Sequence, residues 1–163
     1  MIFYCPKCWS RVKEDEKVCH ECKVDIQPLD HRSYFEKLIG ALNHSERTTR
    51  LRAAYILGEL GDKRAIQPLV DASKKTRDLF LIEGIAIALG KMDDDRVLPA
   101  LIELNKHQSF LVRKVALISL SRFKKKEALA AIREAQNDPS PSVQELAKQI
   151  LQKNSRLKRK NPD

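Results

Sequence analysis

The stretch Thr49-Arg50-x-x-Ala53-x-x-x-Leu57-Gly58 returns three more times along the chain with related residues. The copies begin at residues 49, 81, 112 and 143, which lie 32, 31 and 31 residues apart. In each copy, apolar or small residues recur every four positions, which places them on one face of a helix. A repeat of this length predicts a solenoid. The later copies are Leu81-Ile82-x-x-Ile85-x-x-x-Leu89-Gly90, Val112-Arg113-x-x-Ala116-x-x-x-Leu120-Ser121 and Val143-Gln144-x-x-Ala147-x-x-x-Leu151.

A second apolar pattern precedes each copy and predicts a second helix in every repeat. Capping signals agree with these boundaries, because Ser33 and Glu36 have the spacing of a capping box and Ser140 is followed by Pro141. The sequence therefore predicts four helical hairpins. The preceding patterns are Tyr34-Phe35-x-x-Leu38-Ile39, Ala65-Ile66-x-Pro68-Leu69-Val70, Val97-Leu98-Pro99-x-Leu101-Ile102 and Ala128-Leu129-x-x-Ile132.

The paired patterns, with a branched residue, Arg, Ala and Leu-Gly in the second helix, resemble HEAT repeats. The string Leu57-Gly58-Glu59-Leu60-Gly61-Asp62 is similar to the short HEAT-like variety named for phycobilisome lyases. This resemblance covers residues 32–152 and implies an all-α fold, an α-solenoid whose second helices line the concave side. The chain departs from the pattern at Ile82 and Gln144, where Arg is expected, and at Phe123-Lys124, where a Gly-Asp turn is expected.

The four cysteines of the chain form two Cys-x-x-Cys pairs, Cys5 with Cys8 and Cys19 with Cys22. Two such pairs can enclose one tetrahedral ion, so we expect these four thiolates to hold one structural Zn²⁺ per chain. Iron in the same sulfur cage is the chemical alternative. Oxidised or free thiols are a further alternative, which the lack of a secretion signal disfavours.

The text around the cysteines, Tyr4-Cys5-Pro6-Lys7-Cys8-Trp9-x-x-Val12 and Val18-Cys19-His20-Glu21-Cys22, is similar to the zinc ribbons that open many bacterial and archaeal chains. A glycine usually follows each pair in that family, whereas Trp9 and Lys23 do so here. Strained turns are the expected consequence. A ribbon this short cannot bury enough surface to fold alone, so metal binding should supply most of its stability.

Composition and motifs favour a non-catalytic protein. Aromatic residues make up 6% of the chain, so its 42% of hydrophobic residues are mainly aliphatic and suit packed helices. We find no catalytic set; the run Asp93-Asp94-Asp95 lies between predicted helices, where acids cap the helix that follows. Because we see neither a leader nor an apolar stretch of about 20 residues, we expect a soluble, cytoplasmic protein. Because we find no catalytic set, we expect that it is not an enzyme.

The predicted binding surface lies on the second helices, six residues after the start of each copy. This position holds Tyr55, Ile87 and Ile118, with small residues expected to leave a shallow groove beside them. Lys91 and Arg122 would flank it. We predict that the groove binds another protein; the alternative is that helix packing buries these three side chains. The small residues are Gly58, Gly90 and Ser121.

The net charge of +9 leaves nucleic-acid binding as the alternative function. The basic residues that would serve it in the tail are Arg156, Lys158, Arg159 and Lys160. We therefore expect a zinc ribbon over residues 1–26, a linker over 27–32, a HEAT-like solenoid over 33–153 and a basic, disordered tail over 154–163.

Overall fold

The computed structural model of the chain describes residues 3–5, 7–8, 10–13, 15–26 and 32–160. From residue 34 onward, the described chain forms helical hairpins, which confirms the predicted all-α solenoid. Trp9 lies outside the described residues, as does the predicted linker at 27–32 except for its last residue. The hairpins pair α1 (Tyr34–Ala41) with α2 (Arg47–Leu60), α3 (Ile66–Lys75) with α4 (Leu79–Lys91), α5 (Leu98–Leu104) with α6 (Phe110–Leu120), and α7 (Lys126–Glu134) with α8 (Pro141–Lys160).

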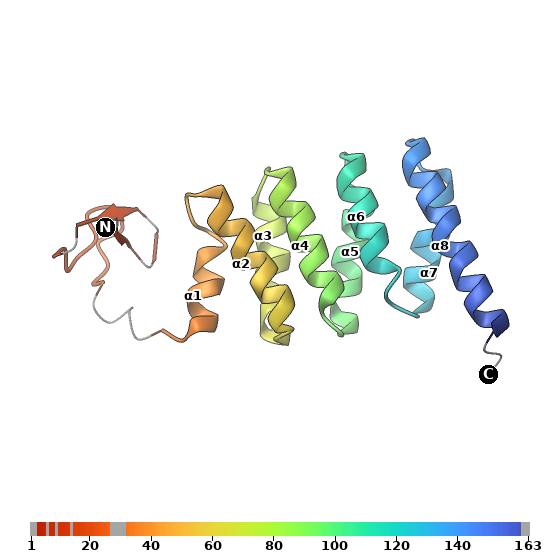
Figure 1. Cartoon of the computed structure of the whole chain (residues 1–163). Coiled ribbons are helices and arrows are strands. Elements are labelled where there is room, and N and C mark those ends of the chain that lie inside the picture. Colours follow the sequence, from red (N-terminus) through yellow and green to blue (C-terminus); the bar gives the residue numbers. More distant parts are fainter. Residues whose placement is uncertain (1–2, 6, 9, 14, 27–31, 161–163) are drawn as a thin grey trace.

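The helices form two layers (Figure 1). The second helices α2, α4, α6 and α8 stand side by side in one layer, and the first helices lie behind them. Within the front layer, α2 packs against α4 and α4 packs against α6. Short 3₁₀ turns lead into or out of the rear helices: η2 (Lys63–Ala65), η3 (Asp95–Val97) and η4 (Ala135–Asn137).

The repeated apolar positions of the sequence form the core. Because the spacing of four keeps them on one helix face, the second and third positions of nearly every copy are buried between the layers. Burial of this kind supplies most of the stability of a short helix. These buried residues are Ala53, Leu57, Ile85, Leu89, Ala116, Leu120 and Ala147.

Two glycines set how closely the front helices approach. A Cβ atom added at Gly58 would lie 2.6 Å from the Cα of Ala88, and one at Gly90 would lie 2.5 Å from the Cβ of Ser119. Both glycines are buried. The prediction that they leave a shallow groove is therefore wrong, because their face of the helix meets the next front helix.

Each hairpin turn contains the same hydrogen bond, made by different side chains. His44, Thr76, His107 and Asp138 each accept the backbone N–H two residues later, at 2.9, 3.1, 3.0 and 2.8 Å. These four residues recur at the spacing of the repeat. The bond fixes the turn that leads into each front helix.

Caps follow the sequence expectation at several helix ends. Ser33 and Glu36 form the predicted capping box at α1. In the acidic run, the Asp94 side chain accepts the N–H of Arg96 and caps η3, as expected for a turn between helices. α8 begins at Pro141, directly after Ser140.

The C-terminal end differs from the sequence expectation. α8 continues to Lys160, so residues 154–160, for which a disordered tail was predicted, are helical. Extending an existing helix needs no new nucleus, and this stretch contains no Gly or Pro before residue 162. The hydroxyl of Ser155 donates to the carbonyl of Leu151, one turn earlier, at 2.9 Å.

Candidate functional site

The cysteine cluster is built on a short hairpin and a tight turn. Strands β1 (Phe3–Tyr4) and β2 (Arg11–Val12) pair antiparallel, which brings Cys5 and Cys8 to the connecting segment. The second pair lies in a turn that is closed by a hydrogen bond from the backbone N–H of Cys19 to the carbonyl of Val24. Cys5 and Cys19 are fully buried.

The four thiol groups fit a single metal ion. Their sulfur atoms all lie within 4.8 Å of one another. The Sγ atoms of Cys5 and Cys22 are 3.7 Å apart, and those of Cys8 and Cys19 are 3.6 Å apart. A tetrahedral ion with metal–sulfur bonds of about 2.3 Å requires sulfur–sulfur distances of about 3.8 Å. The predicted ligand set is thus brought together, and it can bind a metal ion.

The surroundings of the sulfurs favour thiolates at some positions and require a cation at others. The backbone N–H of Cys22 and the hydroxyl of Ser10 lower the pKa of the Cys19 thiol to about 6. Burial raises the pKa of the Cys22 thiol to about 12, so a nearby cation is needed to keep it ionised at neutral pH. The Ser10 hydroxyl lies 3.1 Å from the Cys8 sulfur and 3.2 Å from that of Cys19. Sequence reasoning missed Ser10, whose spacing carries no ligand signal.

The second cysteine turn carries the strain expected from its missing glycine. Lys23 has a φ of 56°, in the left-handed region that glycine adopts without steric cost. Its N–H donates to the carbonyl of Cys19 at 2.9 Å. This bond closes the turn that holds Cys19 and Cys22 together, so the strain at Lys23 serves the ligand geometry.

The predicted binding residues lie exposed on the front layer. Tyr55, Ile87 and Ile118 are 53%, 42% and 51% exposed, so the alternative that packing buries them is wrong. Further large apolar side chains are exposed on the same side of these helices, spaced four or seven residues from the first three. We call the complete set the apolar face: Leu51, Tyr55, Phe80, Ile87, Leu111 and Ile118.

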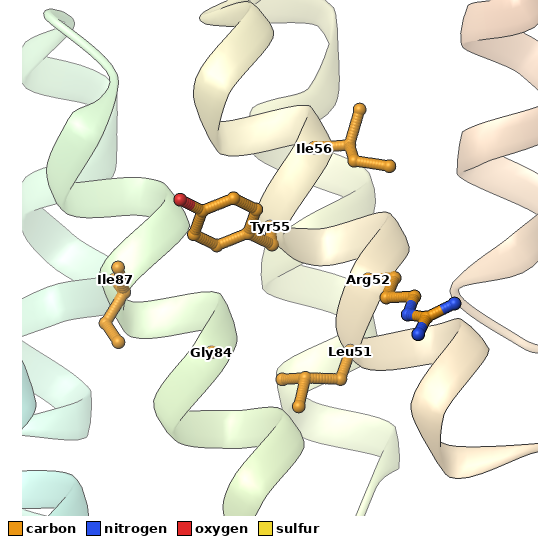
Figure 2. Close-up of a pocket in the computed structure, with 6 residues that line it drawn as sticks. All are labelled: Leu51, Arg52, Tyr55, Ile56, Gly84 and Ile87. Atoms are coloured by element: carbon orange, nitrogen blue, oxygen red, sulfur yellow. The ribbon is translucent and has the colours of Figure 1, made fainter.

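A pocket of about 350 Å³ opens in this face between α2 and α4. Figure 2 shows Tyr55 reaching from α2 toward α4, with Ile87 on α4 and Leu51 beside Gly84. Gly84 lines the pocket and has no side chain where the other repeats have Arg52, Val115 and Leu146. A Cβ atom added there would lie 2.4 Å from the Cδ1 of Leu51, so the glycine leaves room for the Leu51 side chain. Sequence reasoning missed Gly84 and Leu51; the glycine at this repeat position was the available signal. The lining residues are Leu51, Arg52, Tyr55, Ile56, Gly84 and Ile87.

The two predicted flanking cations differ in their surroundings. Lys91 forms an ion pair with Glu59, and its ammonium lies 4.3 Å from the centre of the Tyr55 ring. The hydrogen bond that Lys91 donates to Glu59 raises the pKa of Lys91. Arg122 is exposed. Lys91 therefore ties α4 to α2 and holds Tyr55 in place, while Arg122 is available to a partner.

The basic residues proposed for nucleic-acid binding, Arg156, Lys158, Arg159 and Lys160, lie in the last turns of α8. Their side chains fall outside the described part of the structure. Among the helices that the structure describes, none combines the length and apolar character needed to cross a membrane.

Comparison with known proteins supports the repeat architecture. Residues 81–152 match the family model for HEAT repeats, and residues 49–75 match the model for the PBS lyase HEAT-like repeat. No curated protein matches the chain. These two segments cover most of the helical hairpins, and the layers seen in Figure 1 are those of such an array. The helical part of this chain is therefore an array of HEAT repeats.

Proposed function

We propose that this chain is a non-catalytic interaction protein, a scaffold or adaptor whose HEAT array binds another protein. The observation that carries the proposal is the apolar face, which exposes large side chains in three consecutive front helices. Scattered single apolar residues are common on protein surfaces, but a contiguous group marks an interaction site. The pocket at Gly84 gives this face a defined recess.

Quantitative affinity capture with matched variants tests the proposal. Ile87→Glu places a charge in the centre of the apolar face, whereas Tyr34→Glu changes a side chain that is 62% exposed on α1, in the other layer. A partner retained by the wild type and by Tyr34→Glu but lost by Ile87→Glu supports the proposal. A partner that Ile87→Glu retains in full contradicts it.

We further propose that Cys5, Cys8, Cys19 and Cys22 hold one structural Zn²⁺ per chain. The sulfur distances suit a tetrahedral ion, and four thiolates leave no open position for a reacting water. The thiolates would fix the hairpin and the turn, and the ion would supply their common link. The cytoplasm, our proposed location, keeps such thiols reduced.

Metal analysis of the purified protein decides between zinc and iron. We expect about one zinc per chain, no iron–thiolate absorption, and loss of zinc together with hairpin structure when a chelator is added. A protein isolated with iron, or without metal and with free thiols, would contradict the zinc assignment.

Nucleic-acid binding is the second candidate, favoured by the net charge of +9 and the basic run at the end of α8. Retention on immobilised DNA or RNA should then fall steeply with salt and should be lost when residues 156–163 are removed. Retention that does not depend on these residues excludes the tail as the binding element.

A further inference from the structure

We infer that the apolar face binds an acidic amphipathic helix of the partner, with one large apolar side chain seated in the pocket at Gly84. This inference rests on the proposed function, because it assumes that the partner is a protein. It concerns the conformation and the charge of the bound segment, neither of which follows from the repeat architecture alone.

The spacing of the apolar face favours a helix over an extended chain. Tyr55, Ile87 and Ile118 occupy the same position of consecutive repeats, on helices that pack side by side. Packed helices lie about 8–10 Å apart. Along a partner helix that crosses them, side chains on the same face recur every seven residues or so, a distance of about 10.5 Å. Along a strand, side chains on the same face recur about every 6.6–7 Å. The helix therefore matches successive repeats.

The pocket supplies an anchor point for this helix. Its volume of about 350 Å³ equals that of roughly a dozen water molecules in the liquid, which is room for one bulky side chain. Most of the lining is aliphatic or aromatic, contributed by Leu51, Tyr55, Ile56 and Ile87. The ion pair and cation–π contact of Lys91 hold the Tyr55 side of the pocket in place. An apolar side chain fits such walls, since polar groups would find few partners there.

The charges beside the apolar face favour an acidic segment. In the part of the chain that the structure describes, Arg52, Lys114 and Arg122 form no ion pair. On the same side of α4, the carboxylate of Glu83 has no paired cation among the described residues. The unpaired charge on the face is thus positive overall.

Charged residues that are already paired add little to this balance. Glu59 is neutralised by Lys91, and Arg47 is neutralised by Asp78, to which it donates at 2.8 and 2.9 Å. A basic partner would have to compete with these internal cations for Glu59 and Asp78. An acidic partner finds Arg52 and Arg122 available, so the charges select its sign.

Selection from a display library of random 18-residue peptides tests the inference without assuming a sequence. The target is the full zinc-loaded chain. Enriched peptides are synthesised, and their affinities are measured by fluorescence anisotropy against the wild type, Ile87→Glu, Arg122→Glu and the control Tyr34→Glu. Circular dichroism reports whether the peptide becomes helical when bound. Ile118→Glu, one repeat further along, replaces Ile87→Glu if that variant does not fold.

We expect enriched peptides with a net negative charge and apolar residues at i, i+3 or i+4, and i+7. They should become helical on binding, bind Ile87→Glu at least tenfold more weakly, and bind Arg122→Glu more weakly at low salt, with Tyr34→Glu unchanged. Peptides that depend on Ile87 but are basic, or that alternate with period two, overturn the inference and leave the proposed function standing. If no enriched peptide depends on Ile87, the inference fails, and affinity capture alone then decides the proposed function.

Discussion

Replacing Asp138 with alanine is expected to cost about 3–5 kcal/mol of unfolding free energy, because the change leaves the guanidinium of Arg113 buried without its counter-charge. The two side chains are 7% and 10% exposed. They join α6 to the turn before α8, so the pair links the third hairpin to the fourth.

The magnitude follows from the hydrogen bonds that are lost and kept. Arg113 donates from Nε and Nη2 to the two carboxylate oxygens of Asp138, at 2.7 Å each. Its Nη1 group keeps the carbonyls of His107 and Gln108, at 2.8 and 2.9 Å. The backbone N–H of Ser140 also loses its acceptor, a cost of about 1–3 kcal/mol that is not fully additive with the first.

Urea unfolding followed by helical circular dichroism measures the effect. With a slope of about 1–3 kcal/mol per molar urea, the midpoint should fall by about 1 M or more, and the α7–α8 hairpin should unfold ahead of the rest. The control is Glu134→Ala, which breaks the ion pair of Lys106 and Glu134, whose side chains are 62% and 68% exposed. It should cost less than about 0.5 kcal/mol. Equal effects of the two variants would refute the reasoning.

Acid pH gives a second measure of the same pair. The hydrogen bonds from Arg113 lower the pKa of Asp138 below its ordinary value of 3.8. The stability that this carboxylate contributes is therefore present above pH 3.8 or so, and it is lost as the pH falls through the lowered pKa of the folded state. Asp138→Asn should abolish this part of the acid dependence while retaining an acceptor for the turn.

Three further predictions concern single positions. Gly58→Ala should destabilise the chain by about 1–2 kcal/mol in urea unfolding, because the added Cβ meets the backbone of α4, and this cost outweighs the better helix propensity of alanine. Gly84→Ala should not destabilise the chain, because its added Cβ meets only the flexible end of the Leu51 side chain. Lys23→Gly should strengthen zinc retention against a chelator by up to about 1 kcal/mol, because glycine adopts the positive φ of this position without steric cost. Unchanged retention would argue against backbone strain at Lys23. Burial lowers the pKa of His44 below 6.5, so the free energy of unfolding should fall as the pH drops below 6.5. Replacing His44 with threonine, the residue that accepts the same turn hydrogen bond in the next repeat, should remove this loss of stability, and a loss that persists in the variant would show that another group causes it.

The helical hairpins could be predicted because their signal is periodic. Apolar residues such as Leu57 and Leu89 recur in register on one helix face, and this face is buried against the other helices whatever the exact placement of the neighbouring repeats. The turn residues gave no such signal. His44, Thr76, His107 and Asp138 share one task but differ in chemistry, and the repeat spacing relates them only once their common hydrogen bond is seen.

The cysteine cluster could be predicted in full, and the apolar face only in part. Two Cys-x-x-Cys pairs predict a metal site by their spacing alone, since few other functions require thiols at this spacing. Tyr55, Ile87 and Ile118 were found from periodicity, but the pocket beside them was not. A pocket depends on which residue of the next helix lies opposite, and this requires the distance and the register between α2 and α4, which a single sequence does not contain.

The glycines show how the packing and the candidate site are connected. Their small size predicts Gly58 and Gly90 to be groove residues, yet these glycines allow α2 and α4, and then α4 and α6, to come into close contact. This close approach sets the separation at which Tyr55, Ile87 and Ile118 stand on the outer surface. Gly84 lies toward the outer surface instead, where its missing side chain leaves room for Leu51, and both residues line the pocket. The buried glycines therefore set the spacing that the proposed partner helix would match, and the half-buried Gly84 lines the pocket proposed for its anchoring side chain.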